Sequence, residues 1–313
     1  MSLPTHKKAI IALIIANIIW GAASPIFKLA LSNIAPFTLA FIRFFFASLF
    51  LLPFLGSGWR VAKKEWGKLV LVSLFGVTIN ISYFFWGLML APSINAPIIA
   101  SSGPIVLYLA SIIVLGEKPH KKVLIGTLVS LAGVFAIIGQ PILLKRIDGE
   151  LLGNLFFVIA TLGAVAHALV LKRISVKIPT LTLTFWMFFI GSVSFFIPAV
   201  KENIINPFWQ SLDLRGVIGI LYGVFFSSIL AYTLFDWGVR QIHAQDVGVF
   251  SYIDPIAAIL IAIPLLGETI SLIFVIGSLF VLGGIFIAEG RIHYHPVHRL
   301  AQKNNRSNRI SNS

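Results

Sequence analysis

Long apolar runs fill most of this sequence. Apolar residues make up 58% of the chain and charged residues only 11%, whereas about 25% charged residues is typical of a soluble domain. The runs are close to the roughly 20 residues that a helix needs to cross a bilayer. They are continuous rather than alternating, which favours helices over the strands of a membrane barrel. The sequence therefore predicts an all-α polytopic membrane protein with ten transmembrane helices. Their expected spans are 9–31, 37–56, 67–90, 95–115, 122–140, 151–172, 180–199, 215–238, 246–266 and 272–289.

The basic residues are distributed unevenly among the connections of these runs. If the N-terminus lies in the cytoplasm, the outer connections hold only Lys145, Arg146, Lys201 and Arg215, and most other Lys and Arg residues fall on the inner side. This positive-inside pattern accounts for much of the formal net charge of +13 without a nucleic-acid partner. We expect a multi-pass protein of the inner (plasma) membrane with both termini in the cytoplasm. The basic tail at 291–313 is expected to be disordered or to lie on the membrane surface.

The second half of the chain repeats the first. The stretch at 104–135 recurs 151 residues later, at 255–286, without a gap. Each copy opens with a proline, passes through a Gly-Glu turn and enters a second apolar run. The matched residues are Pro104 and Pro255, Gly116-Glu117 and Gly267-Glu268, Gly126 and Gly277, Gly133 and Gly284, and, further upstream, Trp86-Gly87 and Trp237-Gly238.

This repeat has a consequence for topology. Each half holds five predicted helices, an odd number, so the second half must enter the membrane from the side opposite to the first. We therefore expect two inverted five-helix repeats, at 1–142 and 143–290, with the two Gly-Glu turns on opposite sides. The turns themselves are interpreted as helix ends, where glycine adopts torsions that other residues resist. Inverted repeats are typical of secondary transporters, whose site lies near the midplane between the repeats.

These motifs resemble those of the drug/metabolite transporter superfamily and its EamA-like family. The resemblance rests on WGAASPIFKLA at 20–30, on LGE at 115–117 and 266–268, and on the Gly-rich stretches IGTLVSLAGVF and IGSLFVLGGIF. It implies secondary transport of a small molecule through a central cavity lined by the first four helices of each half. It leaves the substrate open, because similar proteins export amino acids, move drugs, or carry nucleotides and sugars. No GxxxxGK[ST] loop occurs, so ATP is not expected to drive transport directly.

Polar residues inside the predicted helices are candidates for the cavity lining, because a polar side chain in lipid needs a partner or water. Asp254 is expected near the middle of its helix, followed by Pro255, which withholds a backbone donor. Two roles are open for Asp254: an ion pair with Arg43 or Lys28, and a substrate or proton site. Arg43 and Lys28 either face the cavity or snorkel to the membrane surface.

The other candidates also have simpler explanations. Asp236 could pair with Arg240 one turn along its helix, and His167 could shuttle protons or be packed and hydrogen-bonded. Aromatic side chains could stack on a substrate or cation or fill helix interfaces. The predicted substrate-binding residues are Asn17, Trp20, Lys28, Arg43, Tyr83, Trp86, Ser102, His167, Tyr232, Asp236, Tyr252 and Asp254.

No catalytic residue, cofactor or metal site is predicted. The sequence has no cysteine, which excludes disulfides and thiolate ligands, and neither HExxH nor GxSxG occurs. His293, His295 and His298 are spaced like metal ligands, but the tail supplies no further ones. The expected function is the export of a small, amino-acid-like metabolite by alternating access, with the substrate and the lipid bilayer as partners. The alternatives are an uncoupled facilitator or exchanger of the same fold, and an intramembrane enzyme or assembly factor.

Overall fold

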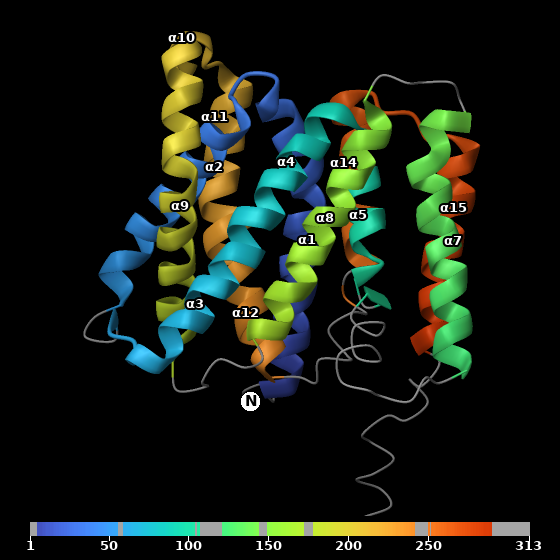
Figure 1. The fold of residues 1–313 in the computed structure, drawn as a ribbon, viewed down its shortest axis with the longest axis horizontal. Coiled ribbons are helices and arrows are strands. Elements are labelled where there is room, and N and C mark those ends of the chain that lie inside the picture. The colour runs from blue at the N-terminus through green and yellow to red at the C-terminus, as the bar shows by residue number, and fades with distance from the viewer. Residues whose placement is uncertain are drawn as a thin grey trace, which may run out of the picture.

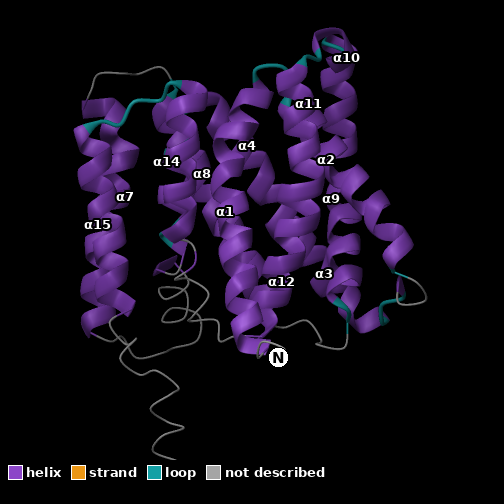
Figure 2. Ribbon diagram, turned by 180° about the vertical axis from the view of Figure 1, so that it is seen from behind, coloured by secondary structure: helices purple, strands orange, loops and turns teal. Residues whose placement is uncertain are grey.

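The computed structural model describes residues 5–55, 59–103, 105–106, 121–143, 149–171, 178–241, 250 and 252–289. All regular secondary structure in this part of the chain is helical, which confirms the all-α prediction (Figures 1 and 2). The main helices are α1 (Thr5–Leu31), α2 (Pro36–Leu51), α3 (Trp66–Ser73), α4 (Asn80–Leu90), α5 (Asn95–Ala100), α7 (Lys121–Leu143), α8 (Glu150–Leu171), α9 (Thr180–Ile205), α11 (Leu214–Leu221), α12 (Ala231–Gln241), α14 (Ile253–Leu266) and α15 (Leu272–Glu289). Single-turn elements are η1 (Leu52–Phe54), η3 (Lys63–Glu65) and α10 (Phe208–Ser211).

Two of the longest helices contain a π-helical segment. η4 (Leu74–Ile79) joins α3 to α4, and η5 (Tyr222–Leu230) joins α11 to α12, so each set forms one continuous helix. A π-helical turn bonds residue i to residue i+5, is rare, and occurs frequently at functional sites. The two segments therefore mark the helices in which a site is to be sought.

Seven helical stretches in the described residues are long and apolar enough to cross a membrane. They coincide with seven of the predicted runs, and two further runs correspond to the shorter apolar helices α14 and α15. The run predicted at 95–115 is described only through α5 and residues 101–103, 105 and 106. A polytopic membrane protein is therefore confirmed, while the number of ten spanning helices stays a prediction.

Some predictions fall on residues outside the described ranges. They concern Pro104, the Gly116-Glu117 turn, Lys145, Arg146 and the tail at 291–313 with its three histidines.

Successive long helices alternate in direction between two ends of the molecule (Figure 1). We call the end that carries the N-terminus the N end and the opposite end the far end. The connections that follow α1, α4, α9 and α14 lie at the far end. Hydrogen bonds join these connections: for example, Ser211 donates to the carbonyl of Asn33, and Glu268 accepts from the amide of Ser93.

The long helices pair across the two halves of the sequence in a regular way. α1 packs along α12 and α14, and α8 packs along α4 and α5. α2 packs along α9, and α7 packs along α15. Suppose that each helix is replaced by its counterpart in the other half, so that α1 becomes α8 and α4 becomes α12. The same set of pairings is then obtained. The most extensive helix contacts therefore lie between the halves rather than within them.

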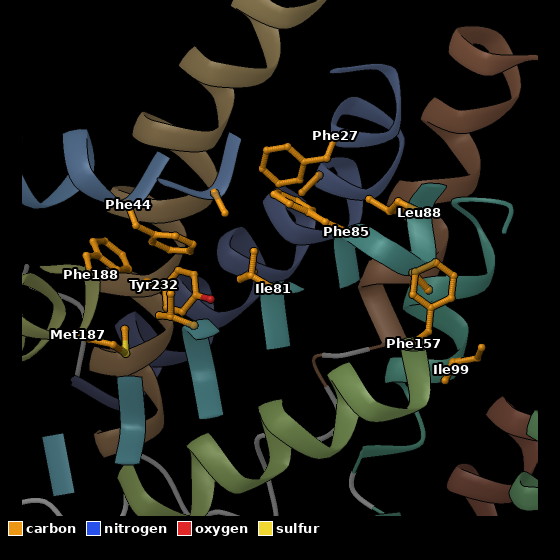
Figure 3. Close-up of a cluster of buried hydrophobic side chains, with 14 of the residues drawn as sticks. Phe27, Phe44, Ile81, Phe85, Leu88, Ile99, Phe157, Met187, Phe188 and Tyr232 are labelled. Atoms are coloured by element: carbon orange, nitrogen blue, oxygen red, sulfur yellow. The ribbon is translucent and has the colours of Figure 1, made fainter. Parts of the chain in front are cut away.

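Aromatic side chains from both halves fill the core (Figure 3). Phe27 and Phe44 come from the first half, Phe157 and Phe188 come from the second, and all four are nearly inaccessible to solvent. The outer faces of peripheral helices carry exposed apolar side chains instead, such as Phe286 in α15, which is 79% exposed. Large exposed apolar surfaces of this kind mark contact with a membrane.

Glycines set the distance between α7 and α15. Gly133 lies against the carbonyl of Gly277, and Gly284 lies against the backbone of Gly126 and Ser130, so that a Cβ at Gly133 or Gly284 would overlap backbone atoms. In the sequence repeat, Gly126 is equivalent to Gly277 and Gly133 is equivalent to Gly284. Exchanging the two halves therefore converts one of these contacts into the other.

Gly284 and its neighbour Gly283 offer a matched test of this packing, because a Cβ added at Gly283 meets no atom within 4 Å. Gly284→Val should force α7 and α15 apart and cost about 1–3 kcal/mol, the range for overpacking. Gly283→Val should leave stability nearly unchanged. Thermal denaturation of the detergent-purified variants measures the difference, and equal melting temperatures would contradict the packing described.

Candidate functional site

Each π-helical segment presents a backbone carbonyl to the opposite half. The carbonyl of Ser227 in η5 accepts hydrogen bonds from Trp20 Nε1 (3.1 Å) and Arg43 Nη2 (3.2 Å). The carbonyl of Gly76 in η4 accepts one from Tyr232 Oη (3.0 Å). Gly76 and Ser227 are 151 residues apart, so they occupy equivalent positions of the sequence repeat. The two halves are thus joined at matching points.

Arg43 is buried at this junction, with 1% of its surface exposed. Its Nε donates to Ser228 Oγ (2.6 Å) and its Nη2 to Ser227 Oγ (2.9 Å). The guanidinium carbon lies 4.8 Å from the ring centre of Phe27 and 4.6 Å from that of Phe44. Within the described residues no carboxylate lies at ion-pair distance. Because a buried cation is costly without a negative partner, this site is suited to an anion.

Of the alternatives open for Arg43, snorkelling and an ion pair with Asp254 are not what the structure has, and the inward-facing alternative agrees with its burial. Its side chain points into the protein, and neutral serine oxygens and aromatic faces surround it instead of a carboxylate. The side chain finds hydrogen-bond acceptors inside the protein because η5 supplies the hydroxyls of Ser227 and Ser228 and the carbonyl of Ser227.

Tyr232 connects Arg43 to a second group of polar side chains. Its ring centre lies 5.1 Å from that of Trp20 and 6.4 Å from that of His167. His167 Nε2 in turn lies 3.5 Å from Asp236 Oδ1. We call Trp20, Arg43, His167, Tyr232 and Asp236 the central cluster. The structure therefore brings together five of the twelve predicted site residues.

Asp236 pairs differently from the simple expectation. Its i+4 neighbour Arg240 donates to Thr180 Oγ1 (3.2 Å) and to the carbonyl of Ile178 (2.9 Å), while the carboxylate lies against His167. Asp236 is completely buried. The proposed pair with Arg240 is wrong because the side chain of Asp236 points to α8, and that of Arg240 points to the start of α9.

Asp254 lies in the first turn of α14, against Gly21 of α1. A Cβ on Gly21 would overlap the Asp254 carbonyl, so the two helices approach closely here. The expected position near the middle of its helix is therefore wrong, because α14 begins only at Ile253. The carboxylate benefits from the positive N-terminal end of α14. Its Oδ1 atom is buried and has no hydrogen-bond partner among the described residues, and the expected ion pairs with Arg43 and Lys28 are not formed.

Lys28 forms an ion pair with Glu268 instead, at 3.2 Å between Nζ and Oε1, and donates to the carbonyl of Ala91 (2.7 Å). Glu268 also accepts from the amides of Ser93 (2.7 Å) and Ile94 (3.1 Å). The amino group of Lys28 is thus held by protein groups at the far end. The interpretation of the second Gly-Glu turn as a helix end is confirmed at its glycine, which is in the left-handed conformation with φ of 64°.

A second carboxylate joins the halves at the same end. Glu202 of α9 accepts from the amides of Phe37 (3.1 Å) and Thr38 (2.7 Å) at the start of α2. A carboxylate at a helix N-terminus is favoured by the free amides and the helix dipole. We call the contacts made by Glu202 and by Glu268 with Lys28 the far-end latch, because each joins the second half to the first.

The remaining predicted residues have local partners. Asn17 donates to the carbonyl of Leu13, and Ser102 to that of Ile99. Tyr83 and Trp86 pack against each other, with ring centres 5.4 Å apart. Both also contact Phe156 of α8, and Tyr252 packs against the core at the start of α14. These contacts do not connect the five residues to the central cluster.

Sequence reasoning missed the residues that act through backbone geometry. Ser227 and Ser228 are adjacent hydroxyls in an apolar run, and this was the available signal for them. Gly76 could have been found from its position 151 residues before Ser227. Glu268 was interpreted only as part of a turn that ends a helix, but its side chain bonds Lys28 and the amide of Ser93.

Comparison with known proteins places the chain among membrane transporters. The sequence model of the EamA-like transporter family matches residues 7–139 and 151–289. The chain belongs to the EamA-like transporter family. An uncharacterized transporter of Archaeoglobus fulgidus is 26% identical to this EamA-like protein over 278 residues, which cover 88% of this chain and 94% of the relative. The uncharacterized transporter YetK of Bacillus subtilis is 28% identical over 280 residues, covering 86% of this chain and 83% of YetK.

A solved crystal structure supports the same fold. It superposes on this EamA-like protein with a TM-score of 0.63, covers 90% of this chain and 97% of its own, and is 20% identical in sequence. The match of the family model confirms the resemblance to the EamA-like family proposed from the sequence motifs.

The far-end latch can be tested through a cysteine, because the natural sequence has none. Ser93 is fully buried beside Glu268, so Ser93→Cys should react slowly with a water-soluble maleimide. The additional substitution Glu268→Gln removes the ion pair with Lys28. It also replaces one carboxylate oxygen by an NH₂ group, which cannot accept from the amides of Ser93 and Ile94. Losing about 1.5 kcal/mol of charged hydrogen bonding should raise the labelling rate about tenfold.

Asp213→Asn is the control for the latch experiment. Asp213 is an exposed helix cap whose side chain accepts from the amides of Arg215 and Gly216, and asparagine caps equally well. This variant should leave the labelling rate of the cysteine unchanged. An equal rate with and without Glu268→Gln would show that Glu268 does not hold the far end closed.

Proposed function

We propose that this EamA-like protein is a secondary transporter that exports a small metabolite by alternating access between two inverted halves, residues 1–142 and 143–290. The observation that carries the proposal is the buried Arg43 at the junction of the halves. It presents a positive charge without a carboxylate partner in the described residues. A negatively charged group on the substrate would supply that partner.

Three features of the fold support inverted halves. The helix pairings map onto themselves when the halves are exchanged. The π-helical segments η4 and η5 occur at equivalent places, and the carbonyls of Gly76 and Ser227 bond across the junction. Helices at equivalent places run in opposite directions: α1 leads away from the N end and α8 leads toward it (Figure 1). An exchange axis in the membrane plane has this effect.

The far-end latch supports alternating access. In this conformation, Glu202 and Glu268 bond amides of the first half at the far end, whereas at the N end Trp186 donates to the carbonyl of Trp59. Opening the far end requires breaking charge-assisted hydrogen bonds, and closing it restores them. The balance between two such states is what substrate binding must shift.

We further propose that the substrate is amphoteric and amino-acid-like. Arg43 would bind its carboxylate, because guanidinium groups form paired hydrogen bonds with carboxylates. Asp254, with a buried and unbonded Oδ1 atom, would bind its ammonium group. Both residues lie beside α1: the guanidinium of Arg43 lies near the ring of Phe27, and the backbone of Asp254 lies against Gly21.

The orientation follows from charge. Arg60, Lys63, Lys64 and Lys68 all lie in or beside the connection at the N end. We propose that this end faces the cytoplasm, with both chain termini there and the far end outside. A plasma-membrane location fits this arrangement.

Two other functions are retained as alternatives. An uncoupled facilitator or exchanger would have the same fold and the same Arg43 site, but its flux would ignore a pH gradient. An intramembrane enzyme or assembly factor is the remote alternative, because the central cluster holds no nucleophile beside a base in the arrangement that hydrolysis requires.

Substitution of Arg43 tests the proposal. Arg43→Lys keeps the charge but cannot make the paired hydrogen bonds, and Arg43→Gln removes the charge. Exchange of a radiolabelled mixture of the standard amino acids should fall at least about tenfold in Arg43→Lys and further in Arg43→Gln. Proteoliposomes that contain equal amounts of monodisperse protein provide the assay.

Arg215→Gln is the matched control for Arg43, because Arg215 is exposed at the far end and its ion pair with Asp213 spans 4.0 Å. It should exchange amino acids at the rate of the unmodified protein. If folded Arg43→Gln also exchanged amino acids at that rate, Arg43 would not be the anion site.

A further inference from the structure

His167 and Asp236 form a buried titratable pair that substrate binding by Arg43 and Asp254 does not use. His167 lies on α8 and is 4% exposed, and Asp236 lies on α12 and is 0% exposed. Nε2 and Oδ1 are 3.5 Å apart, and neither atom has another hydrogen-bond partner among the described residues. A buried carboxylate without donors is expensive unless a positive charge or a proton compensates it.

Both ring nitrogens of His167 face oxygen acceptors. Nε2 faces the carboxylate of Asp236, and Nδ1 lies 3.4 Å from the carbonyl of Val72. A neutral imidazole has one N–H donor and would turn a lone pair toward one of these oxygens, whereas an imidazolium donates to both. A proton carried by either ring nitrogen therefore has an oxygen atom of the protein beside it.

The first half holds the ring in place. A Cβ on Gly76 would overlap Nδ1 of His167, so only glycine admits the ring here. The same Gly76 accepts the hydroxyl of Tyr232 through its carbonyl. The pair consists of second-half residues, but Val72 and Gly76, which complete its surroundings, belong to the first half.

We propose that His167 and Asp236 are the proton site through which this transporter is coupled to the proton gradient, an inference that rests on the proposed transport function. The Nδ1–H acceptor, the carbonyl of Val72, lies on the opposite half. Movement of one half relative to the other removes that acceptor and weakens proton binding to the ring. By linkage, the proton then favours the conformation described here and is released in the other.

The surrounding charges permit this role. On the elements packed against the pair, Tyr232 donates to Gly76. Arg240, one turn along α12, donates to Thr180 and Ile178, and its positive charge also acts on Asp236. Arg43 lies beyond the ring of Phe44. The other described titratable groups on these elements lie toward the helix ends or the periphery: His6, Lys7, Lys8, Lys28, Lys68, Tyr83, Lys121, Glu150, Lys201 and Glu202, together with Glu65 beside Lys68 and Tyr222 beside Arg43.

The protonation state of His167 is measured directly by ¹⁵N NMR of histidine-labelled protein in nanodiscs. The chain has seven histidines, and the resonances lost in His167→Gln identify the ring. At pH 7 both ring nitrogens of His167 should be protonated, and in Asp236→Asn one of them should become unprotonated. An unprotonated ring nitrogen in the unmodified protein at pH 7 would overturn the assignment.

Coupling is measured separately in proteoliposomes with the radiolabelled amino-acid mixture as the probe. At a fixed amino-acid gradient, the flux of the unmodified protein should change at least about threefold when an opposing pH gradient is added. His167→Gln, Asp236→Asn and the double variant should retain downhill flux that does not respond to the pH gradient. Asp213→Asn, the same substitution at an exposed helix cap, should respond like the unmodified protein.

The outcomes distinguish the two proposals. If the unmodified protein moves no amino acid, the proposed substrate is wrong, and the NMR measurement still decides the proton site. If it moves amino acids without response to pH, or if Asp236→Asn keeps the full response, the coupling role is overturned. A variant that loses stability is replaced by the double variant, in which no unpaired buried charge remains.

Discussion

Two backbone carbonyls, those of Gly76 and Ser227, join the halves of this protein in the middle of its helix bundle. Backbone polar groups inside a bilayer must be bonded within the protein, and a π-helical turn redirects a carbonyl from its usual helical partner. The carbonyl of Ser227 accepts hydrogen bonds from Trp20 and Arg43 of the opposite half, and that of Gly76 accepts one from Tyr232. Each of these contacts joins a neutral backbone carbonyl to a side-chain donor.

The central cluster is built on that junction. Arg43 gains serine hydroxyls from η5 but no carboxylate in the described chain, and His167 fits only because Gly76 has no side chain. Charge is therefore concentrated where the two halves meet, and neutral aromatic packing surrounds it (Figure 3). Away from the junction, the far-end latch consists of carboxylates that accept hydrogen bonds from backbone amides. Charge-assisted hydrogen bonds of this kind are stronger than hydrogen bonds between neutral groups.

Much of the fold could be predicted from the sequence, because apolar runs of membrane length have few alternatives to helices. The repeat spacing of 151 residues predicted that the helices with Trp86 and Trp237 are equivalent, but it did not predict the π-helical segments η4 and η5 next to them. Partners of individual polar residues were less predictable. Asp236 was matched to Arg240 from helical spacing, but the tertiary packing of α8 brought His167 closer. For Lys28 the sequence left open whether it faces the cavity or snorkels, and it gave no sign of its partner Glu268, which comes from a turn far along the chain. These side-chain pairs depend on how the helices pack against one another, which cannot be derived from a single sequence.

The central claim is that the halves lie in opposite orientations across the membrane. Arg60 and Gln210 occupy equivalent connections, after the second helix of each half, and both are exposed. The most direct test labels Arg60→Cys and Gln210→Cys, one at a time, with a membrane-impermeant maleimide on intact cells. The account predicts that Gln210→Cys reacts from outside and Arg60→Cys only after permeabilisation. Labelling of both cysteines from the same side would contradict it.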